Sequence, residues 1–427
     1  NYDNPGGGRF KLAVVVVRSA PQPALRDPVV YINGGPGSPL TIYADHQART
    51  PYAAGRDLIL VDQRGTGRSE PSLCPDLDDA FLDSTLAIAT DATEDALAKR
   101  RTVYAACRAE ATARGFDLKD FGTSVTVADF EWVRRALGIA RWNVYGESYG
   151  TTVAMTLLAL HPETVRAAVL DSLYPPDPKP MQSVSVADAL DAFFRYCAGD
   201  QACAAIYPDL AATYRETLSG LAAPLLVTVP PEMHRPDDRV SLTSTLFEAL
   251  VSRLIYYPSA YPSLPRLIAT VHDRDSQGLG KVLASAYAAM AAAVNPSTNL
   301  AVECRDRPHY RTSLPADASV LDRLQPYGLC DDWSEIGPVP LVPNGTAVPT
   351  LVLAGEFDPV TRPSLSRQVA ALIGSKARWV EFPRIGHNVR GFSPCGARIA
   401  ADFIDNPAQQ PDTSCADRAA PIRFLPR

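Results

Sequence analysis

The segment Trp142–Gly150 limits what this chain can fold into more than any other stretch. It reads as a short apolar strand followed by Gly-x-Ser-x-Gly, and an apolar helix is expected over Thr151–Leu160. The residues that flank the serine of such an elbow must be almost without side chains, because strand and helix crowd together there. Gly146 and Gly150 meet this need. The elbow would expose the hydroxyl of Ser148 above a sheet, which predicts a nucleophile.

Length and composition set the broad class. The chain has 427 residues, enough for one large domain with an insertion or for two domains. The net charge is −6 and no Lys/Arg-rich run occurs, so neither a nucleic acid nor an anionic membrane is expected as a partner. The apolar stretches, such as 153–160, are too short to span a bilayer. No Cys-x-x-Cys motif or Cys/His cluster occurs, so neither a metal nor a cofactor is expected.

The eight cysteines indicate an oxidising compartment. They fall into pairs that are close in sequence, although eight cysteines allow about 105 connectivities. Eight free thiols in a cytosolic enzyme are the alternative. We expect an exported, disulfide-bonded protein whose targeting segment has been removed before Asn1. The predicted bridges are Cys74–Cys107, Cys197–Cys203, Cys304–Cys330 and Cys395–Cys415.

Alternating strands and helices predict an α/β fold with a mostly parallel sheet. The pattern breaks at Tyr174–Pro178, and a mainly helical stretch follows until the strands return near residue 349. We therefore expect an α/β domain in two parts, 1–173 and 343–427, with a helical cap inserted at 174–342. The expected strands are 10–18, 28–32, 57–62, 142–145, 165–171, 349–354 and 377–382, and the expected helices are 78–115, 126–137, 151–160, 186–197, 246–256, 281–293 and 364–373.

An acid and a histidine follow the serine in the order that such elbows require. Asp358 follows the strand 349–354 and His387 follows the strand 377–382, so both lie at the carboxyl edge of the sheet. His387 would take the proton of Ser148, and Asp358 would orient the imidazole. Asp171 and Glu356 are rival acids. The other histidines are interpreted as structural or surface residues: His46, His161, His234, His272 and His309.

Two backbone N–H groups are expected to bind the oxyanion. One belongs to Tyr149, directly after the nucleophile. The other comes from the glycine-rich loop after the strand 28–32, where we assign Gly35, with Gly37 as the alternative. A phosphate-binding loop is disfavoured, because no Lys-Ser/Thr follows and no Gly-x-Gly-x-x-Gly occurs.

Several motifs together resemble the prolyl iminopeptidase family of the α/β-hydrolase superfamily, and more closely its secreted tripeptidyl aminopeptidase branch. The resemblance covers nearly the whole chain and is weakest at 175–300. The motifs are Asn-Gly-Gly-Pro-Gly at 33–37, Asp-Gln-Arg-Gly-Thr-Gly-Arg-Ser at 62–69, Gly-Glu-Ser-Tyr-Gly at 146–150, Tyr-Asp-Asn-Pro at 2–5, Ala-Val-Glu-Cys-Arg-Asp at 301–306 and Gly-x-x-Asp-Pro-Val-Thr at 355–361.

The resemblance implies a serine exopeptidase that removes one to three residues from a free peptide N-terminus. A helical cap would close over the site, and acidic cap residues would receive the substrate ammonium. It implies triad roles for Ser148, Asp358 and His387. One departure concerns the oxyanion loop, which usually begins with His in this family and begins here with Asn33.

Glu303 is the expected anchor for the substrate amine, with Asp306 as second candidate. An acidic pair beside a predicted disulfide would be held rigidly enough to bind a cation. The alternative is a solvated carboxylate or one paired with the neighbouring Arg305 or Arg307. Two further charged residues, Asp62 and Arg64, are expected to hold their own loop together and not to touch substrate.

Two other functions are compatible with these residues. The same triad could serve an esterase or amidase on small hydrophobic esters, since function resides in the site and not in the fold. A non-catalytic binding module is the third reading, and the intact Ser, Asp and His argue against it. Dehalogenases and epoxide hydrolases would need a carboxylate nucleophile in the elbow, and Ser148 argues against both.

Overall fold

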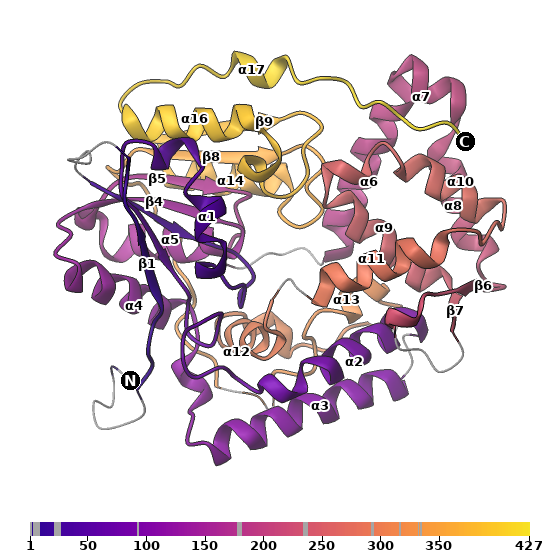
Figure 1. The fold of residues 1–427 in the computed structure, drawn as a ribbon, viewed down its shortest axis with the longest axis horizontal. Coiled ribbons are helices and arrows are strands. Elements are labelled where there is room, and N and C mark those ends of the chain that lie inside the picture. The colour runs from indigo at the N-terminus through magenta and orange to yellow at the C-terminus, as the bar shows by residue number, and fades with distance from the viewer. Residues whose placement is uncertain are drawn as a thin grey trace.

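The helices and strands form two parts, a sheet flanked by helices and a group of helices beside it (Figure 1). The computed structural model describes residues 2, 9–20, 27–91, 94–176, 182–233, 238–291, 294–315, 317–331, 333 and 335–427. Several sequence features lie wholly or partly outside these residues, among them positions 3–5 of the N-terminal motif, positions 177–178 of the pattern break, His234, and positions 292–293 of the helix expected at 281–293. Over the described ranges, no helix is both long and apolar enough to cross a bilayer.

The main sheet has seven strands in the order β1-β3-β2-β4-β5-β8-β9. Strand β1 runs antiparallel to β3, and the other pairs are parallel. This arrangement confirms the predicted α/β fold. The strands are β1 (Val14–Val17), β2 (Val29–Ile32), β3 (Leu58–Val61), β4 (Trp142–Glu147), β5 (Val165–Asp171), β8 (Thr350–Gly355) and β9 (Ala377–Phe382).

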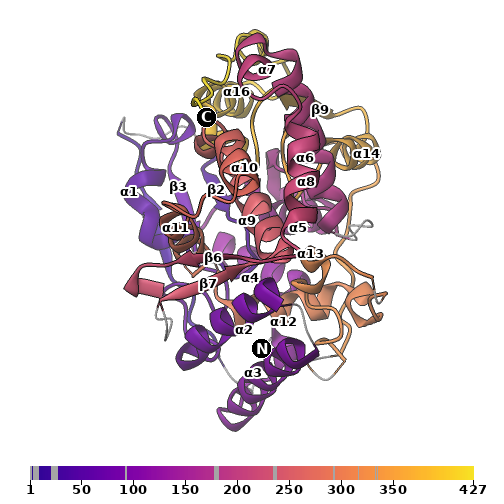
Figure 2. The same cartoon turned by 90° about the vertical axis from the view of Figure 1, so that its right-hand side faces the viewer.

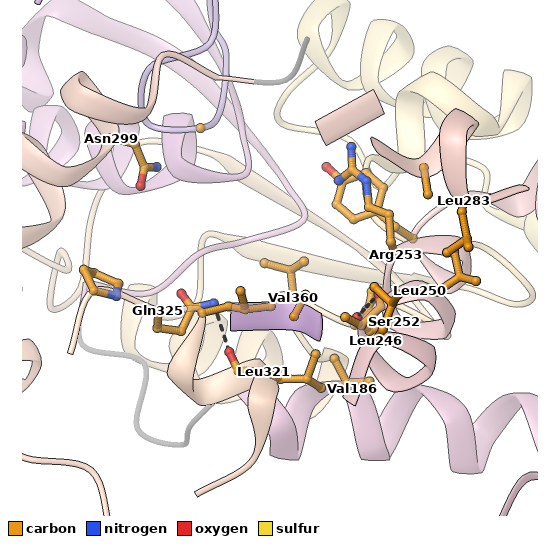
Figure 3. A pocket seen from close by; sticks show the side chains of 18 of the residues that line it. Val186, Leu246, Leu250, Ser252, Arg253, Leu283, Asn299, Leu321, Gln325 and Val360 are labelled. Atoms are coloured by element: carbon orange, nitrogen blue, oxygen red, sulfur yellow. Dashed lines mark hydrogen bonds between the residues drawn. The ribbon is translucent and has the colours of Figure 1, made fainter. Parts of the chain in front are cut away.

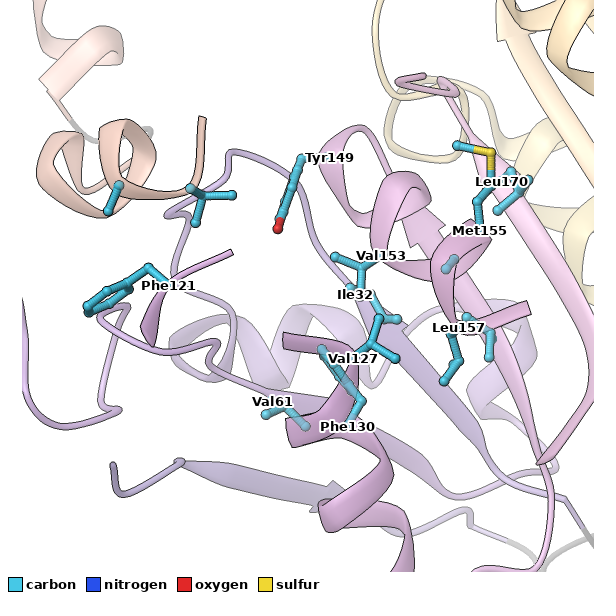
Figure 4. Packing of buried hydrophobic residues seen from close by; sticks show 14 of the residues in the cluster. Ile32, Val61, Phe121, Val127, Phe130, Tyr149, Val153, Met155, Leu157 and Leu170 are labelled. Atoms are coloured by element: carbon cyan, nitrogen blue, oxygen red, sulfur yellow. The ribbon is translucent and has the colours of Figure 1, made fainter. Parts of the chain in front are cut away.

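Alternate residues of the central strands face opposite sides of the sheet, and each side is covered by helices. On β2, Val30 and Ile32 join one apolar cluster, while Val29 and Tyr31 join another. Figure 4 shows part of the first cluster, where Val153 of α5 and Val127 of α4 pack near Ile32. The first side carries α4 (Thr123–Ala136), α5 (Tyr149–Leu160) and α14 (Pro363–Ile373), and the second carries α1 (Ala44–Gln47), α15 (Val389–Phe392) and α16 (Pro394–Asp405).

The described residues between β5 and β8 contribute no strand to the main sheet, and most of their helices build a second apolar core. These helices face the viewer in Figure 2. They are α6 (Gln182–Gly199), α7 (Gln201–Ile206), α8 (Leu210–Gly220), α9 (Ser244–Ile255), α10 (Leu264–His272), α11 (Leu279–Ala291) and α13 (Val320–Arg323). Helix α12 (Pro296–Asp306) instead packs in the first cluster of the sheet through Leu300, Ala301 and Val302.

One hairpin in this insertion was not predicted. Strands β6 (Leu225–Thr228) and β7 (Arg239–Leu242) pair antiparallel. In each strand only alternate residues are buried, so a four-residue stretch carries just two apolar side chains that face the core. Such a pattern is too short to separate from a loop by sequence.

The segment 78–115, expected as one helical stretch, forms two helices, α2 (Asp78–Asp91) and α3 (Glu94–Ala113). Although it precedes β4 in the chain, α2 packs against α9, α11 and α13 of the insertion. Ile88 and Ala89 are buried in the same core as the insertion helices. The division 1–173, 174–342 and 343–427 stays a prediction. By its position in the chain α2 belongs to the first part, but it packs with the insertion.

The four predicted disulfides are all formed: Cys74–Cys107, Cys197–Cys203, Cys304–Cys330 and Cys395–Cys415. Every cysteine of the chain is used. These bridges are consistent with an extracytoplasmic location.

The last residues return to the insertion. After α17 (Ser414–Asp417) the chain crosses the top of the molecule in Figure 1 and ends beside the insertion helices. Leu425 N–H donates to Pro262 O at 2.8 Å, and Tyr207 Oη donates to Leu425 O at 2.8 Å. Ile422 and Phe424 pack against the insertion core.

Candidate active site

Ser148 occupies the strained turn that the sequence predicted between β4 and α5. Its backbone has φ 54° and ψ −125°, a conformation that a residue with a side chain rarely adopts. The crowding is severe at Gly150, where a Cβ atom would overlap the carbonyl of Ile32. The neighbouring strand fixes the turn, since Ser148 N–H donates to Asp171 O at 2.9 Å.

Asp358 and His387 lie together in loops that leave β8 and β9 at the carboxyl edge of the sheet. The imidazole Nδ1 is 2.9 Å from Asp358 Oδ2 and 3.0 Å from Oδ1, and both side chains are buried. Three further donors hold the carboxylate, namely the N–H groups of Val360 and Thr361 at 2.8 Å each and Thr361 Oγ1 at 2.6 Å.

The environment favours a charged carboxylate beside a basic imidazole. Burial opposes ionisation of Asp358, but the charge of His387 and the hydrogen bonds from His387 and Thr361 outweigh it and hold the pKa of Asp358 below its ordinary value. Burial likewise works to lower the pKa of His387, yet the adjacent Asp358 carboxylate raises it above the ordinary histidine value.

The two rival acids have other partners. Asp171 Oδ1 accepts from Val389 N–H at 2.8 Å, and Oδ2 accepts from Arg390 N–H at 2.9 Å, so this carboxylate holds the loop after His387. Glu356 Oε2 accepts from Arg384 N–H at 2.9 Å. Among the described residues, only Asp358 hydrogen-bonds to the imidazole through a carboxylate.

The glycine-rich loop lies against the elbow. A Cβ atom on Gly34 would come within 2.7 Å of Ser148 Cβ, and Gly35 has φ +114°. Asn33, which replaces the expected histidine, supports the loop by donating from Nδ2 to Ser38 O and Pro39 O at 3.0 Å each. The loop thus approaches the nucleophile as an oxyanion loop must.

Ser148 and Gly35 line a cavity of about 380 Å³ between the sheet and the insertion. Its wall is mainly apolar and comes largely from α9, α11 and α13; in Figure 3, Asn299 lies far from Arg253 and Leu283 across the pocket. Apolar lining residues include Val186, Leu246, Leu250, Leu283, Leu321, Leu324 and Val360, and polar ones include Ser252, Arg253, Asn299, Glu303 and Gln325.

Of the two candidate anchors, Glu303 lines this cavity. Its carboxylate lies 2.6 Å from Arg307 Nε, and both side chains are buried. Burial raises the pKa of Glu303, and Arg307 opposes the rise. The guanidinium of Arg307 also donates to Pro175 O and Pro176 O and stacks on the ring of Tyr174. Glu303 is therefore an arginine-paired carboxylate that still faces the cavity.

Asp306 has a different environment and is not part of the cavity wall. Its carboxylate accepts from Thr123 N–H at 2.9 Å and from Thr123 Oγ1 at 2.6 Å. The same hydroxyl lies 2.9 Å from Tyr149 Oη, whose ring points from α5 into the core in Figure 4. Asp306 thus connects α12 to the residue that follows the nucleophile.

Asp62 and Arg64 hold their own surroundings together, as expected. Asp62 accepts from the N–H groups of Leu40, Thr41 and Arg68. Arg64 forms a two-pronged ion pair with Asp129 at 2.5 and 2.8 Å. Tyr2, from the N-terminal motif, also donates to Asp129.

The last feature of the site is how the nucleophile Ser148 lies relative to the base His387. Within the described chain no hydrogen bond joins Ser148 Oγ to the imidazole. Tyr256 of the insertion packs its ring 4.8 Å from that of His387 and also lines the cavity beside Ser148. Catalytic hydrogen bonds are often loose without substrate and tighten on binding.

Sequence reasoning missed three residues around this site: Tyr256, Glu147 and Arg390. Tyr256 comes from the insertion, and no motif marks it. Glu147 is the variable position of the elbow motif, and Arg390 follows His387 by three residues. A charged residue next to the nucleophile was the one available signal, because a buried charge requires a partner.

Comparisons with known proteins identify the fold family. The sequence model described as "alpha/beta hydrolase fold" matches residues 27–392. The chain belongs to the alpha/beta hydrolase fold family. Curated relatives of this α/β hydrolase include a proline iminopeptidase of Neisseria gonorrhoeae, 28% identical over 153 residues (34% of this chain, 33% of the relative). A tripeptidyl aminopeptidase of Streptomyces coelicolor is 30% identical over 187 residues (41% and 34%).

The matched part spans about a third of the length of these curated relatives. Among solved structures, the proline iminopeptidase of Mycobacterium smegmatis is similar over 94% of this chain and 96% of its own, with 16% identity and a TM-score of 0.47. Among the described residues of this α/β hydrolase, no group of three or more His, Cys, Asp or Glu side chains is placed to hold a metal ion.

Proposed function

We propose that this α/β hydrolase is an exported serine exopeptidase that releases one to three residues from free peptide N-termini. One observation carries the proposal: the elbow serine and the buried Glu303 line the same cavity, beside a buried Asp358–His387 pair. The curated relatives named as peptidases support it. The four disulfides support export.

In this mechanism Ser148 Oγ attacks the peptide carbonyl while His387 Nε2 takes its proton. Asp358 holds the Nδ1 proton and stabilises the imidazolium that forms. The N–H groups of Gly35 and Tyr149 would bind the oxyanion, a contribution typically worth about 3–4 kcal/mol of barrier for one donor. His387 then protonates the leaving amine, and water hydrolyses the acyl-enzyme.

The cavity determines the substrate. Glu303 would bind the substrate ammonium, and the apolar wall from α9, α11 and α13 favours apolar side chains between that ammonium and the scissile bond. Arg307 already occupies one side of the Glu303 carboxylate, so the ammonium would share it. Asp306 faces Thr123, which leaves the anchor role to Glu303.

The test compares a peptide anilide that has a free amine with its N-acetylated twin, followed by mass spectrometry of the products of an unlabelled peptide. We expect turnover of the free amine only. Ser148→Ala should lose about 10⁴-fold or more in turnover and all labelling by a fluorophosphonate. Equal turnover of both anilides would favour the esterase or amidase alternative, for which the apolar wall is equally suited.

Glu303→Gln should raise KM for free-amine substrates by about 10–100-fold, because a charged hydrogen bond is lost, and leave any slow turnover of blocked ones unchanged. Glu335→Gln, an exposed carboxylate outside the cavity, is the matched control. An equal effect of Glu303→Gln on blocked substrates would remove the anchor role.

A further inference from the structure

Two charged side chains, the buried Arg390 and the partly buried Glu147, link the serine elbow to the segment after His387. Glu147 immediately precedes Ser148, and Arg390 follows His387 by three residues. Arg390 Nη2 donates to Tyr31 Oη at 2.9 Å, and Tyr31 Oη in turn donates to the carboxylate of Glu147. Arg390 Nη2 also lies 3.5 Å from Glu147 Oε2. A tyrosine hydroxyl therefore bridges an acid and a base that sit next to the two proposed reacting side chains.

The arginine is held from several directions. Its Nη1 donates to Gln47 Oε1 at 3.1 Å, and its guanidinium lies over the ring of Tyr31 at 4.7 Å. Its backbone N–H donates to Asp171, which in turn accepts from Tyr145 Oη at 2.8 Å. Strands β2, β4 and β5 and helix α1 thus all contact Arg390 in α15, directly after the loop that carries His387.

We propose that Glu147 and Arg390 are positioning residues, which hold the Ser148 elbow and the His387 loop at the separation that proton transfer needs. This inference rests on the proposed serine mechanism. In the described structure, no hydrogen bond between Ser148 and His387 maintains that separation, whereas side-chain contacts among Glu147, Tyr31 and Arg390 connect the two segments. A displacement of about 1 Å between reacting groups can cost about 10²-fold in rate.

The charged groups near the imidazole also affect the pKa of His387. Asp358, Glu147 and Asp171 all raise the pKa of His387. The positive charge of Arg390 and the neutral hydroxyls of Tyr31 and Tyr145 share the region under the elbow, and Tyr256 faces the imidazole from the insertion. Removing the negative charge of Glu147 should therefore lower the pKa of His387, which a purely structural role would leave unchanged.

The experiment measures kcat, KM, the rate of fluorophosphonate labelling and the acidic limb of the pH profile for Glu147→Gln and Arg390→Lys. We expect kcat and the labelling rate to fall about 10–10²-fold, with KM changed less than about threefold. The acidic limb should move to lower pH in Glu147→Gln. Arg398→Lys, in an exposed pair with Asp402, is the control and should behave as the wild type.

Rates are expressed per mole of Ser148 that the label titrates at completion, so unfolded molecules do not count. Tyr31→Phe removes the bridging hydroxyl without changing charge and should lower kcat as well. Wild-type kcat per titrated site in Glu147→Gln and Tyr31→Phe, or an unmoved acidic limb in Glu147→Gln, would overturn the inference. Normal turnover by Ser148→Ala would instead overturn the proposed function, so the two failures are distinct.

Discussion

At the scale of single residues, burial by itself would raise the pKa of Asp358 and lower the pKa of His387. Water exclusion disfavours the charged form of each group, but the pair counteracts it by placing the groups 2.9 Å apart. The pKa of the acid falls below its ordinary value, and that of the base rises above its own. The imidazole is thereby made a stronger proton acceptor.

The raised pKa of His387 predicts where the acidic limb of the pH profile lies. Only neutral imidazole can take the proton of Ser148, so kcat/KM should fall as the pH drops through the pKa of His387. Because that pKa is raised, the fall should be centred above about 6.5, the ordinary histidine value. Initial rates from pH 4 to 9 with a free-amine anilide measure it. A rate that is flat from pH 4 to 8, or a limb centred below the ordinary value, would contradict the assignment.

The sequence could identify the site residues that lie in a motif or that follow a predicted strand in the required order. Ser148 is marked by its motif, and Asp358 and His387 by following consecutive strands. The partners of Asp171 were not predictable, since its contacts with Val389 and Arg390 span more than two hundred residues. Glu147 and Arg390 have no motif of their own, so only three-dimensional contacts reveal their pairing.

At the scale of elements, helix α12 connects the cavity to the oxyanion loop. Asn295 N–H, just before the helix, donates to Gly37 O at 2.9 Å, and Asn299 Nδ2 donates to Pro36 O at 3.0 Å. At Gly37, whose φ is +101°, a Cβ atom would come within 2.7 Å of Asn295 O. The far end of the helix carries Asp306, which contacts Thr123 at the start of α4.

The protonation of Asp306 makes its contact with Thr123 depend on pH. Burial, only partly offset by the hydrogen bonds from Thr123 and the charge of Arg307, raises its pKa to about 7. The folded protein therefore keeps this proton to a higher pH than the unfolded chain does. The contribution of Asp306 to the free energy of unfolding should decrease as the pH rises from about 4 to about 7.

Asp306→Asn should remove that dependence, because the amide has no proton to lose in this range. Urea unfolding at pH 5 and pH 8 measures the change in free energy of unfolding. The decrease between the two pH values should be smaller in the variant than in the wild type. Asp317→Asn, an exposed carboxylate, should keep the wild-type decrease. Equal decreases in wild type and Asp306→Asn would show that Asp306 ionises normally.

The sequence predicted helices and strands correctly where the apolar pattern extends over many residues, and it missed them where the pattern is short. Strands β5 and β9 have the predicted bounds, Val165–Asp171 and Ala377–Phe382. The hairpin β6–β7 was missed, because each strand buries only two apolar side chains. Helix α2 was predicted as a helix, but its packing on the insertion depends on contacts far along the chain and could not be read from its own sequence.

At the scale of the whole molecule, an aromatic cluster joins the insertion, the acid loop and the C-terminal segment. Phe357, the residue before Asp358, packs on Phe193 and Tyr196 of α6 at centroid distances of 5.6 and 6.1 Å. Phe424 packs on the same two rings at 6.1 and 6.2 Å. The base of this segment is tied to α16 by the Cys395–Cys415 bridge. The insertion is thus held from the sheet side by two separate stretches of chain.

Phe424→Ala should therefore weaken the seating of the insertion over the site. A fully buried Phe→Ala change costs about 3–5 kcal/mol, and Phe424 is half-buried, so we expect about 2 kcal/mol in the free energy of unfolding. We also expect a higher KM, because the acid loop and the cavity wall share this cluster. Thermal unfolding and steady-state kinetics measure the two effects. Arg423→Ala, an exposed neighbour, should change neither. A loss of stability with an unchanged KM would contradict the second expectation. The C-terminal segment would then stabilise the insertion without affecting substrate binding in the cavity.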